Sequence, residues 1–389
     1  MATSNGNPYL LTSIAFRPLF LLAVLHAVLS LALWSLWWAG VLPMPMPGNP
    51  IYWHGHEMIS GFIGAAIGGF MLTAVATWTQ RPPVSGAPLV FLCLAWLGAR
   101  LGQFSPLAGA LFDFAYWAGL LGLMTVEILR AGNRRNYKIL LLLSVLLISD
   151  MAFHVAQQFF PALQRQILWG QLWLVILLIN LIGGRIIPAF TRNWLLRQQT
   201  GKEPAARQPL PAEFGLVDAL AISSLLVFAL STVLLSSSAW ILFSGLLTGI
   251  LQGWRLCRWQ SHRTLSDPLV WMLHLAYAWI PIGVILLALG LAAYIPVSAG
   301  IHALTVGAIA SMIVAVSSRA ALGHTGRPLH SHRLLTLCIV LLNLAAVARV
   351  TAALSGAVMM LNLASVLWLA AFLCFAMVYV PILVLPAKV

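Results

Sequence analysis

Histidine is the residue type in this chain that is best suited to chemistry, because neutral imidazole is the commonest protein ligand for haem iron, copper and zinc. The chain has ten histidines, and two of them form the sequence His54-Gly55-His56, which Glu57 follows directly. The four cysteines are scattered and form no CxxC pair, which argues against a disulfide framework or a thiolate metal site. A metal site in this chain would therefore use imidazole, which suits haem b or copper.

The segments that position these histidines are apolar. Of the 389 residues, 61% are hydrophobic and 7% are charged, and the mean hydropathy is +0.96. A soluble domain carries roughly 25% charged residues. The apolar runs last ~20 residues, the length of a membrane-spanning helix, and lack the alternation of a transmembrane β-barrel. The composition predicts an all-α, polytopic integral membrane protein.

Breaks at proline, glycine and charged clusters predict about twelve transmembrane helices in two groups of six, joined by a cytoplasmic linker at 192–211. The first group lies near residues 18–40, 54–79, 86–102, 107–130, 136–158 and 165–190. The second group lies near residues 213–236, 238–257, 268–292, 298–320, 330–354 and 357–385. No convincing sequence repeat relates the groups, and residues 1–389 are expected to form a single transmembrane domain.

The basic residues predict the orientation, because cytoplasmic loops are enriched in lysine and arginine. With the N-terminus inside, the outer side holds only Arg100, Arg165 and Arg349 of the 21 basic residues. Both termini are therefore predicted to be cytoplasmic. The net charge of +13 is spread between the apolar runs, so nucleic acid is not an expected partner; the lipid bilayer is.

Orientation assigns each histidine a depth. An outer layer, drawn from three spans, would hold four of them: His54, His56, His154 and His302. An inner layer would hold three more as weaker candidates: His26, His274 and His324. Ionisable residues inside a bilayer are costly and usually functional. The histidines are therefore candidate metal ligands, although helix–helix hydrogen bonds worth ~0.6–2 kcal/mol would also explain them.

Three acidic residues are candidates to orient the imidazoles or to carry protons: Glu57, Asp113 and Asp150. Asp150 lies one helical turn before His154. Glu57 has an alternative role as a carboxylate in the first turn of its helix. His54 and His56 would point ~200° apart on a regular helix and could share a metal only if Gly55 allowed an unusual turn.

Several motifs resemble those of the NnrS family of bacterial membrane proteins, and they occur in order over nearly the whole chain. They are Phe16-Arg17-Pro18-Leu19-Phe20, Trp53-His54-Gly55-His56-Glu57-Met58, Arg81-Pro82-Pro83, Gly184-Arg185-Ile186-Ile187-Pro188-Ala189-Phe190-Thr191-Arg192-Asn193, Arg319-Ala320-Ala321-Leu322-Gly323-His324-Thr325-Gly326-Arg327-Pro328 and Asn343-Leu344-Ala345-Ala346-Val347-Ala348-Arg349-Val350.

The resemblance implies a multi-pass protein of the bacterial inner membrane that contains haem b and copper. It implies a role in nitric oxide metabolism, denitrification and relief of nitrosative stress. It favours His54, His56 and Glu57 as metal-site residues and adds His324 and Arg327. It also raises four arginines as partners of haem propionates: Arg17, Arg185, Arg319 and Arg349.

The leading hypothesis is a metalloprotein that binds or transforms nitric oxide at a site toward the periplasmic face. Two alternatives are a twelve-helix transporter and a factor that delivers haem or metal. Acids near the span ends argue mildly against coupled transport. The absence of CxxCH excludes an attached c-type haem. The electron donor is unidentified, no catalytic residue is assigned, and both an oxidoreductase and a binding protein stay open.

Overall fold

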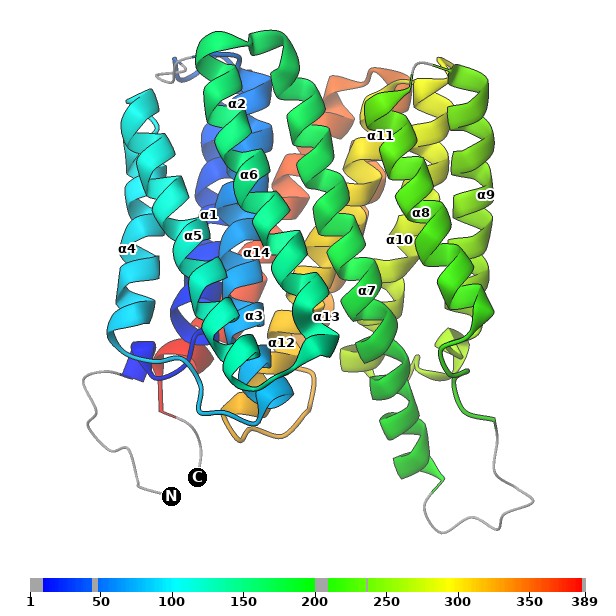
Figure 1. The fold of residues 1–389 in the computed structure, drawn as a ribbon. Helices are drawn as coiled ribbons and strands as arrows, with labels where there is room; N and C mark the ends of the chain where they lie inside the picture. Colours follow the sequence, from blue (N-terminus) through cyan, green and yellow to red (C-terminus); the bar gives the residue numbers. More distant parts are fainter. Residues whose placement is uncertain (1–9, 44–47, 200–208, 236, 387–389) are drawn as a thin grey trace. The chain divides into compact units, whose positions relative to one another are not determined.

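The computed structural model describes residues 10–43, 48–199, 209–235 and 237–386, which form helices and connecting turns with no strand among them (Figure 1). The predicted all-α fold is confirmed. The α-helices are α1 (Phe16–Trp38), α2 (Pro50–His56), α3 (Gly64–Thr79), α4 (Ala87–Gly102), α5 (Pro106–Arg130), α6 (Tyr137–Phe159), α7 (Gln164–Gln198), α8 (Leu216–Leu234), α9 (Ser238–Cys257), α10 (Pro268–Leu291), α11 (Val297–His302), α12 (Ser311–His324), α13 (Arg333–Ser355) and α14 (Val358–Val384).

Ten stretches of the described residues are helical, long and apolar enough to cross a membrane, which identifies a multi-pass membrane protein. The helix α4 is apolar but shorter, and α9 is not among the ten. Many large hydrophobic side chains are exposed along the helices, as contact with lipid requires. The count of twelve spans and the cytoplasmic location of both termini stay predictions.

The chain packs into two compact units. Unit 1 consists of Met1–Leu174, Ser317–Leu329 and Phe372–Val389, and unit 2 of Val175–Val316 and His330–Ala371. The boundaries between the units fall inside α7, α12 and α14. The prediction of a single transmembrane domain stays untested.

The helix α7 extends further than the sequence predicts. It continues to Gln198, past the expected start of the linker at residue 192, and residues 200–208 of that linker lie outside the described part. Arg192 near its end pairs with Glu213 at 3.2 Å. A polar sequence therefore continues the helix, because arginine, leucine and glutamine are good helix formers.

Two of the membrane-spanning stretches contain a π-helical segment. The first, η2 (Glu57–Ile63), joins α2 to α3, and the second, η7 (Ala303–Ala310), joins α11 to α12. Each begins at the residue after a histidine, His56 or His302. The π-helix is rare and occurs mostly as a wide turn inside α-helices, frequently at functional sites. These two segments therefore direct attention to the histidines that precede them.

Candidate metal centre

The helix α2 places His54 and His56 on different sides. Pro50 occupies its first turn, and the Asn49 side chain accepts a hydrogen bond from the Ile51 amide at 2.9 Å. Both histidines therefore lie within the helix, where positions i and i+2 are ~200° apart. An unusual turn at Gly55 that would let them share a metal is absent. Since Asn49 caps this helix, the interpretation of Glu57 as a first-turn carboxylate is also wrong.

Aromatic rings hold the two imidazoles apart. His54 stacks on Trp34 of α1 with 4.4 Å between ring centroids, and His56 stacks on Phe153 of α6 at the same distance. The His56 ring is 5% exposed. Of the pair, His56 is the member that faces the buried polar cluster of unit 1.

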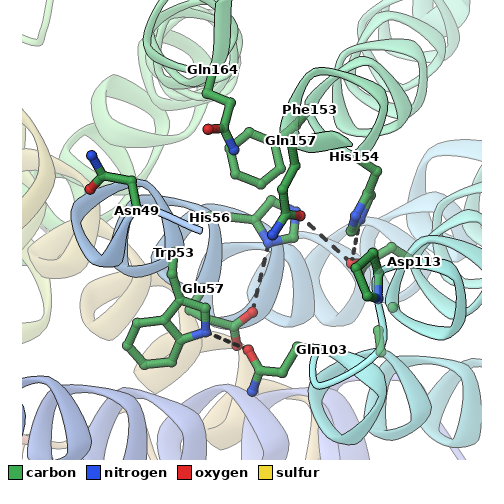
Figure 2. Close-up of a pocket in the computed structure, with 13 residues that line it drawn as sticks. Asn49, Trp53, His56, Glu57, Gln103, Asp113, Phe153, His154, Gln157 and Gln164 are labelled. Carbon is green, nitrogen blue, oxygen red and sulfur yellow. Dashed lines mark hydrogen bonds and ion pairs between the residues drawn. The ribbon is translucent and has the colours of Figure 1, made fainter. Parts of the chain in front are cut away.

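Four side chains from three spans converge around His56 (Figure 2). They are His56, Asp113 of α5, and Asp150 and His154 of α6, and one ligand atom of each lies within 4.8 Å of the others. We call these four residues the His/Asp group. His56 Nε2 lies 3.1 Å from Asp150 Oδ1, and His154 Nε2 lies 3.0 Å from Asp113 Oδ2. Two imidazoles and two carboxylates form a donor set for one metal ion.

A second layer of charge adjoins this group. Arg100 of α4 donates from Nη1 to Glu57 Oε1 at 2.5 Å and from Nη2 to Asp113 Oδ1. His26 of α1 places Nε2 3.2 Å from Glu57 Oε2. Arg100, Glu57 and Asp113 are each less than a tenth exposed. The guanidinium therefore ties Glu57 to an aspartate of the His/Asp group.

The buried charges do not balance. The carboxylates of Glu57, Asp113 and Asp150 face one guanidinium, that of Arg100, so with neutral imidazoles two negative charges are in excess. Isolated buried charges are costly unless they are paired or bind metal. Two protons on the imidazoles or one divalent cation would restore neutrality.

Two buried oxygen atoms beside the group lack a hydrogen bond. They are Oδ2 of Asp150 and Oε1 of Gln171, whose residues are each 1% exposed. Asp150 Oδ1, in contrast, accepts hydrogen bonds from Ser60 Oγ and from Gln171 Nε2. Buried polar atoms are normally satisfied, and the exceptions call for an explanation. A metal ligated by Asp150 Oδ2 would provide one.

A cavity of about 30 Å³ adjoins the His/Asp group, which is room for about two water molecules. Its wall includes His56, Asp113 and His154, and Figure 2 shows their side chains facing it. Polar side chains from helix ends complete the lining: Asn49, Trp53, Gln103, Gln157 and Gln164. Trp53 donates from Nε1 to Gln103 Oε1 at 2.5 Å across this region.

The remaining predicted histidines lie elsewhere, and one of them differs from its expected layer. His26 was expected in an inner layer, but it contacts Glu57 of the outer cluster, because Gly61 has no Cβ to keep its ring away. His324 is exposed in unit 1 and stacks on Phe16 at 5.8 Å. His302 lies in unit 2, with Nδ1 2.8 Å from the Ser298 carbonyl.

His274, also in unit 2, has both ring nitrogens in hydrogen bonds to hydroxyl groups. Its Nε2 is 2.8 Å from Thr191 Oγ1, and its Nδ1 is 2.8 Å from Ser261 Oγ. Because Thr191 donates its own proton to the Ile187 carbonyl, His274 donates from Nε2 and Ser261 donates to Nδ1. As described, neither nitrogen of His274 is directed at a metal site.

The arginines expected near haem propionates include two with backbone partners. Arg17 is buried and donates from Nη1 to the carbonyls of Leu383 and Leu385 at 2.7 and 2.8 Å, at the end of α14. Arg327 donates to the Pro386 carbonyl at 3.3 Å. Helix C-termini attract such cations. The other three, Arg185, Arg319 and Arg349, lie in α7, α12 and α13.

Sequence reasoning missed Arg100, Ser60 and Gln171 as site residues. Arg100 carried a signal that went unused, because it is one of the few basic residues on the predicted outer side and stands in an apolar run. Ser60 and Gln171 carry no such signal, since hydroxyl and amide side chains are common in transmembrane helices.

The fold and the site together define a class: a multi-pass helical membrane protein with a buried cluster of histidines and carboxylates. The family model described as NnrS protein matches residues 10–386, nearly the whole chain. The chain therefore belongs to the NnrS family, as the sequence motifs predict. No curated protein matches it.

Proposed function

We propose that this chain is a membrane metalloprotein of nitric oxide metabolism that holds one metal ion in its His/Asp group. The observation that carries the proposal is the convergence of the four ligand atoms within 4.8 Å. The excess of buried negative charge and the unsatisfied Oδ2 of Asp150 support a divalent cation at this place. Membership of the NnrS family supports nitric oxide as the small ligand.

Copper fits this donor set, whereas haem does not. Imidazole and carboxylate ligands suit Cu(II) and other borderline divalent ions. A porphyrin has no room between His56 and His154, whose ring centroids are 5.0 Å apart, and Phe153 covers one face of His56. The haem that the family resemblance implies therefore requires another place in the chain.

The bound ion would supply a Lewis-acidic position for a small ligand. The chain's own residues define how that ligand arrives and what surrounds it. The amide side chains of Gln103, Gln157 and Gln164 at the helix ends provide a polar approach from the aqueous side. Arg100 and His26 hold Glu57 beside the group. The small cavity favours a ligand of about two heavy atoms.

Metal analysis of the purified full-length protein tests this proposal. We expect about one copper or other divalent ion per chain, lost from His56→Ala and from His154→Gln. His330→Ala, at an exposed loop position, is the matched control and should keep the ion. Nitric oxide should change the electron paramagnetic resonance spectrum of the parent protein but not that of His56→Ala. Unchanged metal content in both site variants would refute the proposal.

A further inference from the structure

One transmembrane segment of unit 1 recurs, at constant residue spacing, in a segment of the second half of the chain. The segments are residues 50–82 and 296–328. They share the following identical pairs: Pro50 and Pro296, His56 and His302, Gly61 and Gly307, Ile63 and Ile309, Ile67 and Ile313, Ala74 and Ala320, Thr79 and Thr325, Arg81 and Arg327, Pro82 and Pro328. A repeat therefore exists, although it does not follow the expected division into two groups of six.

The backbone repeats with the sequence. In both segments a short α-helix ends at the shared histidine, and a π-helix begins at the following residue. The π-helix accounts for well under 1% of residues in proteins. Two of them at equivalent positions of a repeated sequence indicate that this local geometry was retained in both copies.

The shared glycine has a packing explanation in each copy. A Cβ on Gly61 would lie 2.4 Å from His26 Nε2, and a Cβ on Gly307 would lie 2.4 Å from Trp279 Cδ2. The prolines begin or precede their helices. The shared histidine differs, because an ionisable side chain in an apolar span is costly and indicates a function.

The hydrogen bond at His302 fixes the proton on its ring. Nδ1 lies 2.8 Å from the Ser298 carbonyl, which can only accept, so Nδ1 carries the proton. Nε2 of the neutral ring then keeps its lone pair. A histidine that ligates a metal typically donates its other ring N–H to a carbonyl or carboxylate, and this bond orients it.

The charges around the two histidines differ. The position after His56 is Glu57, whereas the position after His302 is Ala303. In the described part of unit 2 the carboxylates are Glu213, Asp218 and Asp267. Asp267 caps the start of α10, and His302 follows the opposite end of that helix. A bare divalent cation at His302 would therefore lack a compensating carboxylate from these residues.

We propose that His302 Nε2 ligates the iron of a haem in unit 2. The porphyrin dianion supplies the negative charge that unit 2 lacks near His302, and imidazole is a common axial ligand of haem iron. The inference rests on the proposed function in one respect: it treats His56, the equivalent residue, as a ligand. The repeat then holds two different metal centres, an ion among carboxylates and a haem on a neutral imidazole.

Haem content and absorption spectrum of the detergent-purified full chain test this inference. We expect haem in the parent and in the control His330→Ala, and at least a tenfold lower haem occupancy in His302→Gly, restored by added imidazole. His302→Met tests the same point without a cavity, and we expect a shifted haem spectrum because the axial ligand changes. Haem content and spectra equal to those of the parent in both His302 variants would overturn the inference, as would a parent without haem.

The two proposals fail separately. If His56→Ala loses the metal ion but keeps the haem, and the His302 variants do the reverse, both are supported. If His56→Ala keeps its ion while the His302 variants lose haem, the ion site in unit 1 is refuted and the haem ligand stands. If the His302 variants lose only the non-haem ion, the haem assignment is overturned.

Discussion

Replacing Arg100 by alanine is the most direct test of how the buried cluster is held together. The guanidinium is 7% exposed and pairs with Glu57 and Asp113, whose side chains are 2% and 3% exposed. Removing one partner of a buried ion pair typically costs about 3–5 kcal/mol, because the other charge stays buried without compensation. Here two carboxylates lose their cation, so we expect a loss at the upper end of that range.

The assay is equilibrium unfolding of metal-stripped protein in mixed micelles, which isolates the arginine from any bound ion. Arg81→Ala is the matched control, since Arg81 also pairs with a glutamate of unit 1, Glu127 at 2.6 Å, but its side chain is 32% exposed. Exposed pairs contribute about 0.2–1 kcal/mol. The triple variant Arg100→Met, Glu57→Gln, Asp113→Asn should recover most of the stability that Arg100→Ala loses, because no charge is left unpaired.

Equal losses in Arg100→Ala and Arg81→Ala would refute this reasoning. The same holds if the triple variant is as unstable as Arg100→Ala, because the lost stability would then come from packing and not from buried charge. Arg100→Lys should lie between the parent and the alanine variant, since lysine keeps the charge but cannot bridge two carboxylates in the way a guanidinium does.

Three further predictions concern packing, capping and metal. Gly61→Ala should cost about 1–3 kcal/mol in unfolding free energy, since its Cβ would meet His26, whereas Gly170→Ala, with open space around it, should be neutral. Arg17→Ala should lower stability by about 1.5–3 kcal/mol, measured in the same unfolding assay, through the lost charged hydrogen bonds to the end of α14. Asp150→Asn should weaken metal binding at least about tenfold in a competition titration, and chelation should lower the melting temperature of the parent but not of this variant.

Depth reasoning from the sequence identified most of the site. The positive-inside rule and the lengths of the apolar runs predicted that His56 and His154 lie at one level, with Asp113 and Asp150 near them, and these four form the His/Asp group. The prediction works because a membrane restricts helices to a narrow range of directions. A residue's place along its span then determines its depth.

Depth alone could not predict which side of a helix a residue occupies. His54 and His302 were grouped with His56 by depth, but His54 turns toward Trp34, and His302 belongs to the other unit. His26 was assigned to the wrong layer for a related reason. Its contact with Glu57 depends on the missing side chain of Gly61 and on the wide turn of η2, which no hydropathy pattern reveals.

The repeated segment also escaped sequence reasoning, because the search compared two halves divided at the linker. The equivalent histidines lie in the second and tenth predicted spans, which do not occupy matching places in two groups of six. The shared residues are few and are spread over whole helices, so the repeat becomes evident only when a π-helix is found after each histidine.

The two copies have diverged in the residues that determine charge. Glu57 and Ser60 of the first copy, which contact Arg100 and Asp150, are replaced by Ala303 and Val306 in the second. These replacements remove a carboxylate and a hydroxyl while the histidine, the glycine and the wide turn remain. A change confined to charge and hydrogen bonding, on a retained backbone, is what two centres of different net charge require. Restoring the carboxylate with Ala303→Glu should therefore destabilise unit 2, because in the described part of that unit no free arginine corresponds to Arg100: Arg255 already pairs with Asp218 at 2.8 Å.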